Sequence, residues 1–473
     1  MTSTRSVRIR RSRQRRSIPS LAFLLLATAC ALNCSTDANG LLDPQGALAG
    51  KGGGAKAIVV NSTAGLVAAL VPENAGKRIL LRVGAYGISQ PLSVPDGVTL
   101  EGEGVMLFDG SGLPTGFAGG TRTTLTMTAN VAGNLLTLGD GATIRRLAVE
   151  DLAGRSGNAI AVVSRGPGDR ISAVISEMEI FNPNAHGQAP AGPTGCGLAA
   201  WTDNPNVGMA PPPHEGAAVT VRMTRSLVTS PSPGTGCGVF AFNFAPFGKV
   251  DVTLDGNVVG GGIIANGGVS RPDAVHDARV AVESRHNLYR DDSADPCAAR
   301  HLGWNLTGGS GSLLPAPAPA TVRNTLRVQS FEDRIEGFTT GVLARAGLRL
   351  TATAGPSSEN TVDLTLIGTT VSTPACGGAA FVADFRLAGA QVLNASLVPG
   401  DGNTLRVLFR KVTGSGTRAN VYTDVLGPSG PQPPSLQGTG NTLEILGSPR
   451  AFEQTNDAID PPPPAEFFTS SGQ

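Results

Sequence analysis

The sequence predicts an all-β fold in which one chain winds into a single-stranded parallel β-helix, a solenoid. Its 473 residues include 63 Gly and 34 Pro but few of the periodic Ala, Leu, Glu and Lys runs that long helices require. Short segments rich in Val, Ile, Leu and Thr alternate instead with Gly, Asn, Asp and Pro. One such pattern recurs at intervals of 27 to 48 residues, which indicates a repetitive body rather than several compact domains.

Residues 1–29 are expected to be an export signal and not part of the fold. Seven arginines lie within residues 5–16, and residues 18–29 are almost entirely apolar but too few for a stable membrane span. The segment ends in "LLATAC", where small residues precede Cys30 as in a bacterial lipoprotein processing site. Lipid on the Cys30 thiol would anchor the mature protein to a membrane of the cell envelope. The alternative is ordinary signal cleavage, which would leave a secreted protein.

Removal of residues 1–29 takes away seven positive charges and changes the formal net charge from +1 to −6. A mildly acidic surface is a poor partner for nucleic acid or for acidic polysaccharide, because both need clustered Lys and Arg. The composition therefore excludes nucleic acid as an expected partner.

The remaining chain divides into three parts. Residues 30–56 are largely aperiodic and become rich in Gly, which is typical of a flexible tether. Residues 57–456 are expected to form the β-helix. Residues 457–473 include four consecutive prolines and should be a disordered tail.

The β-helix is expected to open with a helical cap. Val59 and Val60 form a short strand, and Asn61 or Ser62 can then cap a short helix. A strand returns from Ile79 onward. A helix at this place would cover the open end of the solenoid, where unpaired strand edges would otherwise be exposed.

Within the repeat, alternation places every second strand residue inside. Val250, Val252 and Leu254 should point inward, and Asp251 and Thr253 outward. Successive coils then pair in parallel, so that each strand is hydrogen-bonded to the coils above and below it. The repeats start at Ile144, Ile171, Val219, Val250, Val280, Leu326, Val362, Leu405 and Leu443, and the longest insertions are Asn182–Gly192, Asp203–Gly216 and Thr307–Ala320.

Four repeats begin with an asparagine followed by threonine and an apolar residue. An amide side chain at a tight corner can bond to the corresponding amide of the next coil, which predicts a structural asparagine ladder. The functional alternative is a row of ligand-binding side chains. The four asparagines are Asn324, Asn360, Asn403 and Asn441.

This organisation resembles the right-handed parallel β-helix proteins of the pectin lyase-like superfamily. The resemblance covers residues 57–456 and rests on "GAYGISQPLSVPDGVTLEGEG", on "LLTLGDGATIRRLAVEDL" and on the Asn-Thr repeat starts. It implies a right-handed coil. It does not imply one activity, because the superfamily contains lyases, hydrolases, adhesins and catalytically silent members.

Few catalytic patterns of that superfamily are present. The polygalacturonase-like hydrolases carry Asn-Thr-Asp, Asp-Asp, Gly-His-Gly and Arg-Ile-Lys in this order, and only Asp291-Asp292 matches here. A solvated turn is the alternative interpretation of that pair. The pectate-lyase pattern needs several carboxylates around calcium, and no such acidic cluster can be assembled from the sequence. We therefore expect neither a metal nor a cofactor.

The densest polar stretch, Ser270 to His301, contains the best candidate site. Glu283 and Arg285 should project outward from one strand, with His286 and Tyr289 at the following corner. Together with Asp291 and Asp292 they could form a catalytic groove. The alternative is a solvated face with local ion pairs. The chain has only two Trp and three Tyr, so a long sugar-stacking cleft is not expected.

Cysteine placement predicts one disulfide. "GPTGCGLAAW" and "GTGCGVFAF" put Cys196 and Cys237 at the same point of adjacent coils, which are about 4.8 Å apart and close enough to bridge. Cys297 and Cys376 occupy similar corners. A coil between them would separate them by about 9.6 Å, so we expect them not to be bonded to each other.

Two functions remain open at this point. The first is an exported, lipid-anchored surface protein that binds or scaffolds, with carbohydrate as a possible ligand class. The alternative is a diverged polysaccharide lyase or glycoside hydrolase with its site near residues 283–292.

Overall fold

The computed structural model describes the β-helix from residue 57 onward, with gaps in its loops and C-terminal part. The described residues are 57–185, 187–189, 192–203, 213–231, 237–270, 274–293, 297, 301–311, 320–349, 357–374, 379–384, 402–415, 419–422, 426–427, 430–431 and 442–447. Cys30, Cys376 and Asn441 lie outside them. No helix in this part of the chain is long and apolar enough to cross a membrane.

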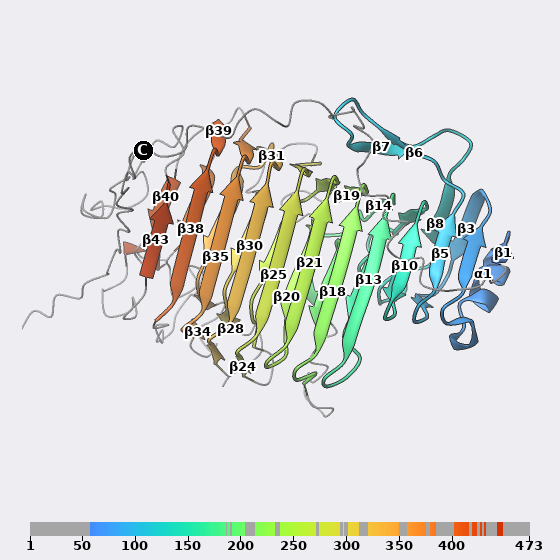
Figure 1. Ribbon diagram of the computed structural model, residues 1–473, viewed down its shortest axis with the longest axis horizontal. Coiled ribbons are helices and arrows are strands. Elements are labelled where there is room, and N and C mark those ends of the chain that lie inside the picture. Colours follow the sequence, from blue (N-terminus) through green and yellow to red (C-terminus); the bar gives the residue numbers. More distant parts are fainter. Residues whose placement is uncertain are drawn as a thin grey trace, which may run out of the picture. The chain divides into compact units, whose positions relative to one another are not determined.

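The described chain is a right-handed parallel β-helix built from three long sheets. After the first strand, which is followed by a helix, each coil contributes one strand to sheet A, one to sheet B and one to sheet C before the chain returns to sheet A (Figure 1). The fold class predicted from the sequence is therefore confirmed. The strands of sheet A, in order, are β1 (Ile58–Val60), β2 (Arg78–Leu81), β5 (Thr99–Gly102), β10 (Ala142–Arg145), β13 (Arg170–Ser176), β18 (Ala218–Thr224), β21 (Lys249–Asp255), β25 (Arg279–Arg285), β30 (Thr325–Phe331), β35 (Thr361–Ile367), β38 (Thr404–Arg410) and β43 (Thr442–Leu446).

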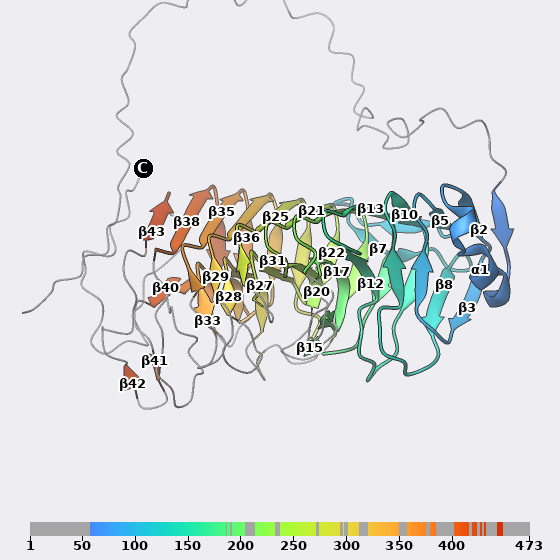
Figure 2. The same cartoon turned by 90° about the horizontal axis from the view of Figure 1, so that it is seen from below.

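Sheets B and C complete the coils (Figure 2). Sheet B consists of β3 (Gly84–Ile88), β8 (Thr123–Met127), β11 (Ala148–Glu150), β14 (Glu179–Phe181), β19 (Leu227–Thr229), β22 (Val258–Gly260), β26 (Leu288–Arg290), β31 (Arg334–Glu336), β36 (Thr370–Ser372) and β39 (Thr413–Ser415). Sheet C consists of β4 (Leu92–Val94), β9 (Leu136–Leu138), β12 (Ile160–Val163), β17 (Cys196–Thr202), β20 (Cys237–Asn243), β23 (Ile263–Asn266), β27 (Leu302–Thr307), β32 (Thr340–Arg345), β37 (Ala379–Asp384) and β40 (Ala419–Tyr422).

Further short strands lie in the loops, outside the three long sheets. Three antiparallel hairpins are β6 (Met106–Phe108) with β7 (Pro114–Phe117), β15 (Gly187–Ala189) with β16 (Gly192–Thr194), and β41 (Leu426–Gly427) with β42 (Gly430–Pro431). Two parallel groups are β24 (Val275–His276), β29 (Thr321–Val322) and β34 (Ser357–Ser358), and β28 (Ser310–Gly311) with β33 (Leu348–Arg349).

The N-terminal cap is the helix α1 (Thr63–Ala69), followed by a 3₁₀ turn η1 (Pro72–Asn74). The Ser62 hydroxyl accepts a hydrogen bond from the Gly65 amide at 3.1 Å, so of the two caps expected from the sequence Ser62 is the one used. Leu66 and Ala69 are buried against the first coil. The helix thereby covers the apolar interior at this end.

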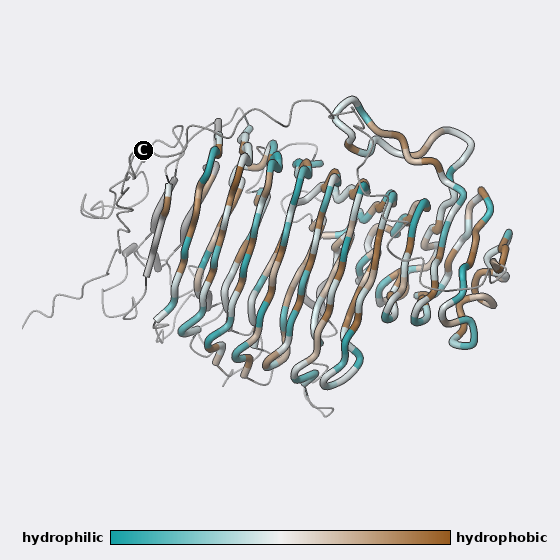
Figure 3. The backbone as a smooth tube through the Cα atoms, in the orientation of Figure 1, coloured by the Kyte–Doolittle hydropathy of each residue, from teal (hydrophilic) through white to brown (hydrophobic). Residues whose placement is uncertain are grey.

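The register of sheet A follows the predicted alternation. Val250, Val252 and Leu254 are buried in the core while Asp251 and Thr253 lie on the outer face, and the same alternation is visible along the strands in Figure 3. The predicted repeat starts fall in one column, which comprises Ile171, Val219, Val250, Val280, Leu326, Val362, Leu405 and Leu443. Ile144 is the exception, since it pairs with Ile175 and not with Ile171.

Side-chain ladders stabilise two corners of the coil. At the corner before sheet A, the Asn360 side-chain oxygen accepts hydrogen bonds from the backbone amide and the side chain of Asn324. The Asn403 side-chain oxygen accepts the corresponding two hydrogen bonds from Asn360, and all four bonds are 2.9–3.2 Å long. A second ladder, which the sequence analysis missed, follows sheet A. There Asn257 bonds to Asn287, and Asn287 bonds to Asp333.

Asp333 takes a ladder position where the two preceding coils have an asparagine. Its carboxylate accepts hydrogen bonds from Asn287 and from the Ser330 hydroxyl, which is 2.6 Å away. Burial nevertheless raises the pKa of Asp333, because the low-dielectric interior disfavours its charged form. The side chain is therefore a structural member of the core rather than a surface acid.

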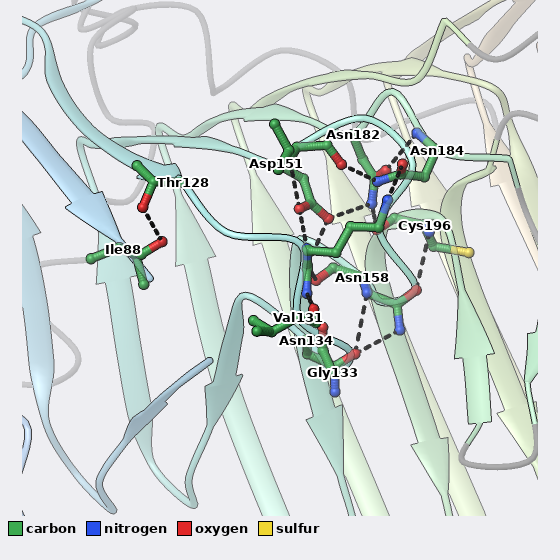
Figure 4. A network of polar contacts seen from close by, with 12 residues as sticks. Ile88, Thr128, Val131, Gly133, Asn134, Asp151, Asn158, Asn182, Asn184 and Cys196 are labelled. Atoms are coloured by element: carbon green, nitrogen blue, oxygen red, sulfur yellow. Dashed lines mark hydrogen bonds and ion pairs between the residues drawn. The ribbon is translucent and has the colours of Figure 1, made fainter. Parts of the chain in front are cut away.

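A fully buried ion pair joins three coils where sheet B leads into sheet C. The Arg155 guanidinium donates to both carboxylate oxygens of Asp151 at 2.5 and 2.7 Å, and both side chains are inaccessible to solvent. Arg155 also donates to the carbonyl oxygens of Val131 and Gly133, and Asn182 donates to Asp151 (Figure 4). The pair is completely enclosed by hydrogen bonds, as a buried charge requires.

Candidate functional site

The six residues proposed as a site from the sequence occupy different places. Glu283 and Arg285 project from the outer face of sheet A, and His286 lies at the corner after it. Tyr289 points into the core, and Asp291 and Asp292 follow β26 at the turn that leads from sheet B to sheet C. The structure therefore does not bring the six together.

The outward placement expected for Tyr289 is wrong. Its side chain is fully buried, its hydroxyl shares a 2.6 Å hydrogen bond with Ser284, and its ring meets Trp304 edge to face. Burial raises the pKa of Tyr289 well above its ordinary value. The physical reason is the corner itself: His286 adopts φ 54°, which turns the chain and restarts the inward–outward alternation in sheet B.

His286 stands at the surface with two acidic neighbours. Its ring nitrogens lie 3.4 Å from Asp255 and 3.6 Å from Glu332, which flank it on the adjacent coils, and 61% of its side chain is exposed. Exposed contacts of this length are weak and screened by solvent. Glu283 is engaged by Arg285, whose Nε lies 2.6 Å from the Glu283 carboxylate.

Asp291 and Asp292 belong to a buried polar corner that also contains His301. The His301 Nδ1 lies 2.8 Å from Asp291 Oδ2, and both side chains are almost completely buried. Asp292 accepts a hydrogen bond from Arg290 at 2.7 Å. Within the described residues, the Oδ2 of Asp292 and the Nε2 of His301 have no hydrogen-bond partner. This corner is the closest association of acid and imidazole near the predicted site, and the sequence analysis did not include His301 in its candidate set.

The outer face of sheet A carries a shallow open hollow of about 280 Å³. The small side chain of Ala281 lies between Asp251 and Arg327 of the neighbouring strands, which leaves space at this point of the sheet. The lining residues come from β21, β25 and β30 and are Asp251, Val252, Thr253, Arg279, Ala281, Val282, Glu283, Arg327 and Gln329.

The side chains around the hollow are mostly planar hydrogen-bonding groups. Carboxylates of Asp251 and Glu283, guanidiniums of Arg279 and Arg327 and the amide of Gln329 offer both donors and acceptors. On the same sheet face the Arg285 guanidinium lies over the Phe331 ring, 4.9 Å from its centre. The arrangement can bind a polar, roughly neutral ligand laid flat on the sheet.

The described part of the chain contains no group of three or more His, Cys, Asp or Glu side chains that could hold a metal ion.

The structure joins Cys196 and Cys237 by a disulfide, with their Cα atoms 4.6 Å apart on adjacent strands of sheet C. Both cysteines lie in an apolar cluster on sheet C with Trp201, Phe240 and other side chains. Cys297, in the loop between β26 and β27, is disulfide-bonded as well. The coil-spacing argument concerned only a bond between Cys297 and Cys376, and it stays a prediction because Cys376 lies outside the described residues.

Comparisons with known proteins give only fold similarity. No family model matches the chain. No curated protein matches it. Among solved structures, the catalytic unit of a thermostable GH87 alpha-1,3-glucanase from Streptomyces thermodiastaticus strain HF3-3 is similar with 14% identity, 86% coverage of this chain, 71% coverage of that chain and a TM-score of 0.32. An endo-xylogalacturonan hydrolase from Aspergillus tubingensis is similar with 10% identity, 83% and 100% coverage and a TM-score of 0.23.

Proposed function

We propose that the protein is an exported β-helix surface protein, lipid-anchored in a bacterial cell envelope, that binds carbohydrate on the outer face of sheet A. The observation that carries this proposal is the hollow around Ala281, where two carboxylates, two guanidiniums and an amide surround one gap in a flat sheet. Its volume lies just below the range of ligand pockets, about 300–1,000 Å³. Such a hollow suits one unit of a polymer that lies across the sheet.

Sugar hydroxyls are both donors and acceptors, so they match a surface that offers carboxylates and guanidiniums together. Paired hydrogen bonds from adjacent hydroxyls fit planar groups such as those of Arg327 and Glu283. The mixed charges leave no strong net charge in the hollow, which favours a neutral saccharide over an acidic one. The long parallel sheet repeats the same strand spacing along the chain, which supports binding of an extended ligand.

The first prediction is that Arg327→Ala weakens binding of the protein's glycan about tenfold, the effect of losing one or two hydrogen bonds to a charged group. The ligand is to be found by screening the wild type against a panel of neutral and acidic oligosaccharides, and affinities are then measured by titration calorimetry. Arg406→Ala is the matched control, because Arg406 occupies the same row of sheet A two coils further on and lies outside the hollow.

Equal losses in Arg327→Ala and Arg406→Ala would place binding elsewhere and contradict the proposal. Failure of the wild type to bind any member of the panel would also count against it.

The buried corner of Asp291, Asp292 and His301 supports a second candidate, a diverged glycoside hydrolase or polysaccharide lyase. A carboxylate in contact with an imidazole is an acid–base arrangement that such chemistry uses. The same glycan panel distinguishes the two functions if released products are assayed. Product formation that disappears in Asp291→Asn, with glycan binding retained, would support the enzyme and displace the binding function from first place.

The second prediction concerns the anchor. Cys30 should carry lipid in the mature protein, because small residues precede it and a Gly-containing segment separates it from the β-helix. Mass spectrometry of the mature N-terminus should find a diacylglycerol-type mass increase on Cys30. Cys30→Ser should release the protein from the membrane fraction. An unmodified N-terminus after residue 29 or 31 would contradict the anchor and leave a secreted protein.

A further inference from the structure

An unusual cluster of arginines lies on the outer face of sheet A near its N-terminal end. Glu101 of β5 is completely buried, although its side chain points away from the solenoid core. It is covered by Arg78 of β2, Arg145 of β10 and Arg146 at the corner after β10. Two of these guanidiniums, those of Arg78 and Arg145, lie 2.8 Å from the same Glu101 oxygen.

One carboxylate cannot neutralise three guanidiniums. Neighbouring charges are already paired elsewhere, since Glu103 binds Arg82 and Glu177 binds Arg225. Burial, and then the charge of Arg78, lower the pKa of Arg145, with Glu177 acting in the opposite direction. The cluster therefore holds two positive charges in excess of its one buried carboxylate.

Each guanidinium has five N–H donors in a planar fork. One nitrogen of Arg78 and one of Arg145 donate to Glu101, and one nitrogen of Arg146 contacts it. Among the described residues, the Nε atoms of Arg145 and Arg146 are buried without a hydrogen-bond partner. All three side chains remain partly exposed, Arg78 most of all at 47%.

We propose that Arg78, Arg145 and Arg146 form a binding site for a dianionic oxyanion of the phosphate or sulfate type, with Glu101 holding the three guanidiniums in position. An excess of two positive charges matches a dianion, and forked guanidiniums bind such oxyanions through paired hydrogen bonds. The site is separate from the hollow around Ala281. Five strand spacings along sheet A, about 24 Å, lie between Glu101 and Ala281.

The overall net charge of the protein does not decide what this local cluster binds. A net charge of −6 after signal removal disfavours acidic partners as a bulk property. It does not govern a local site in which three guanidiniums of adjacent coils share one carboxylate. The spacing of the coils produces this cluster, since Glu101 and Arg145 are direct partners in the sheet register.

The third prediction tests this site with calorimetric titration of the full mature protein at low ionic strength. Inorganic phosphate and inorganic sulfate should bind with a Kd of about 1 mM or tighter. Arg78→Gln should weaken that binding about tenfold, and Arg78→Lys should retain part of it because the charge is kept. Glucose 6-phosphate and glucose, compared in parallel, show whether a phosphate carried on a sugar is bound better than the free ion.

The control is Arg323→Gln, which removes a similarly exposed arginine that has Asp277 as its own partner. It should leave phosphate binding unchanged. Circular dichroism melts verify that each variant is folded, and Arg327→Ala, which affects only the hollow, should also bind phosphate normally. Absence of phosphate and sulfate binding in the wild type would overturn the proposal, as would equal binding by Arg78→Gln and the wild type.

Discussion

Asp151→Ala should lower the free energy of unfolding by about 3–5 kcal/mol, because it leaves the buried Arg155 guanidinium without its carboxylate. The Arg155 side chain is inaccessible to solvent and cannot turn toward water without disturbing the corner. Its remaining partners are carbonyl oxygens, including that of Val131 at 3.2 Å, and these do not neutralise its charge. The measurement is chemical denaturation of the purified variant.

A double replacement separates two contributions to the free energy of unfolding: the loss of the ion pair, and the cost of leaving the Arg155 charge buried without a partner. Asp151→Leu with Arg155→Met removes both charges and should be less destabilised than Asp151→Ala, since apolar residues of similar size often replace a buried pair at little cost. Asp363→Ala is the surface control. It breaks the exposed contact with Arg406 at 3.4 Å and should change stability by less than about 1 kcal/mol. If Asp151→Ala lowered the free energy of unfolding as little as Asp363→Ala does, the prediction would be contradicted. Water would then have to reach the Arg155 guanidinium.

The sequence predicts the sheets of this protein better than its corners. Alternating apolar residues such as Val250, Val252 and Leu254 reveal sheet A because a strand buries one face and because its side chains alternate with a period of two. Asn324, Asn360 and Asn403 stand out because an Asn-Thr pair recurs at the same point of each repeat.

The second ladder has no such signal. Asn257, Asn287 and Asp333 occupy equivalent positions, but the residues before them differ: Gly256, His286 and Glu332. In all three places the preceding residue has a left-handed backbone conformation. That conformation could not be predicted from residue type, because His286 and Glu332 are not glycine. The same corner explains why Tyr289 is buried, since the turn at His286 restarts the inward–outward alternation in sheet B.

Charged contacts between coils, or across a long loop, were still harder to predict. Glu101 and Arg145 are 44 positions apart, and Asp291 and His301 come from opposite ends of one loop. Coil lengths vary with each insertion, so the sequence does not determine which charges become neighbours until the register is known. This is why the candidate set contained Asp291 and Asp292 but neither His301 nor the arginines around Glu101.

Replacing Cys196 and Cys237 together by alanine should lower the free energy of unfolding by about 4 kcal/mol, the chain-entropy cost expected for a cross-link that spans 41 residues. The double variant is preferable to chemical reduction, because reduction would also act on the disulfide of Cys297. Most of this loss in stability should arise because the denatured chain gains conformational entropy when the cross-link is removed. The dependence of unfolding free energy on denaturant should therefore become steeper, as an unrestrained denatured chain exposes more surface.

The native backbone around these cysteines should survive the change, which makes the prediction a test of the cross-link itself. The Cys196 amide donates to Asn158 at 3.0 Å, and its carbonyl oxygen accepts from Asn182 at 2.9 Å. Neither bond depends on sulfur. The sheet C pairing of β17 with β20 also continues over several further residues, including Leu198 with Val239. A loss below about 1 kcal/mol, with an unchanged denaturant dependence, would mean that the denatured chain is already restrained without the disulfide.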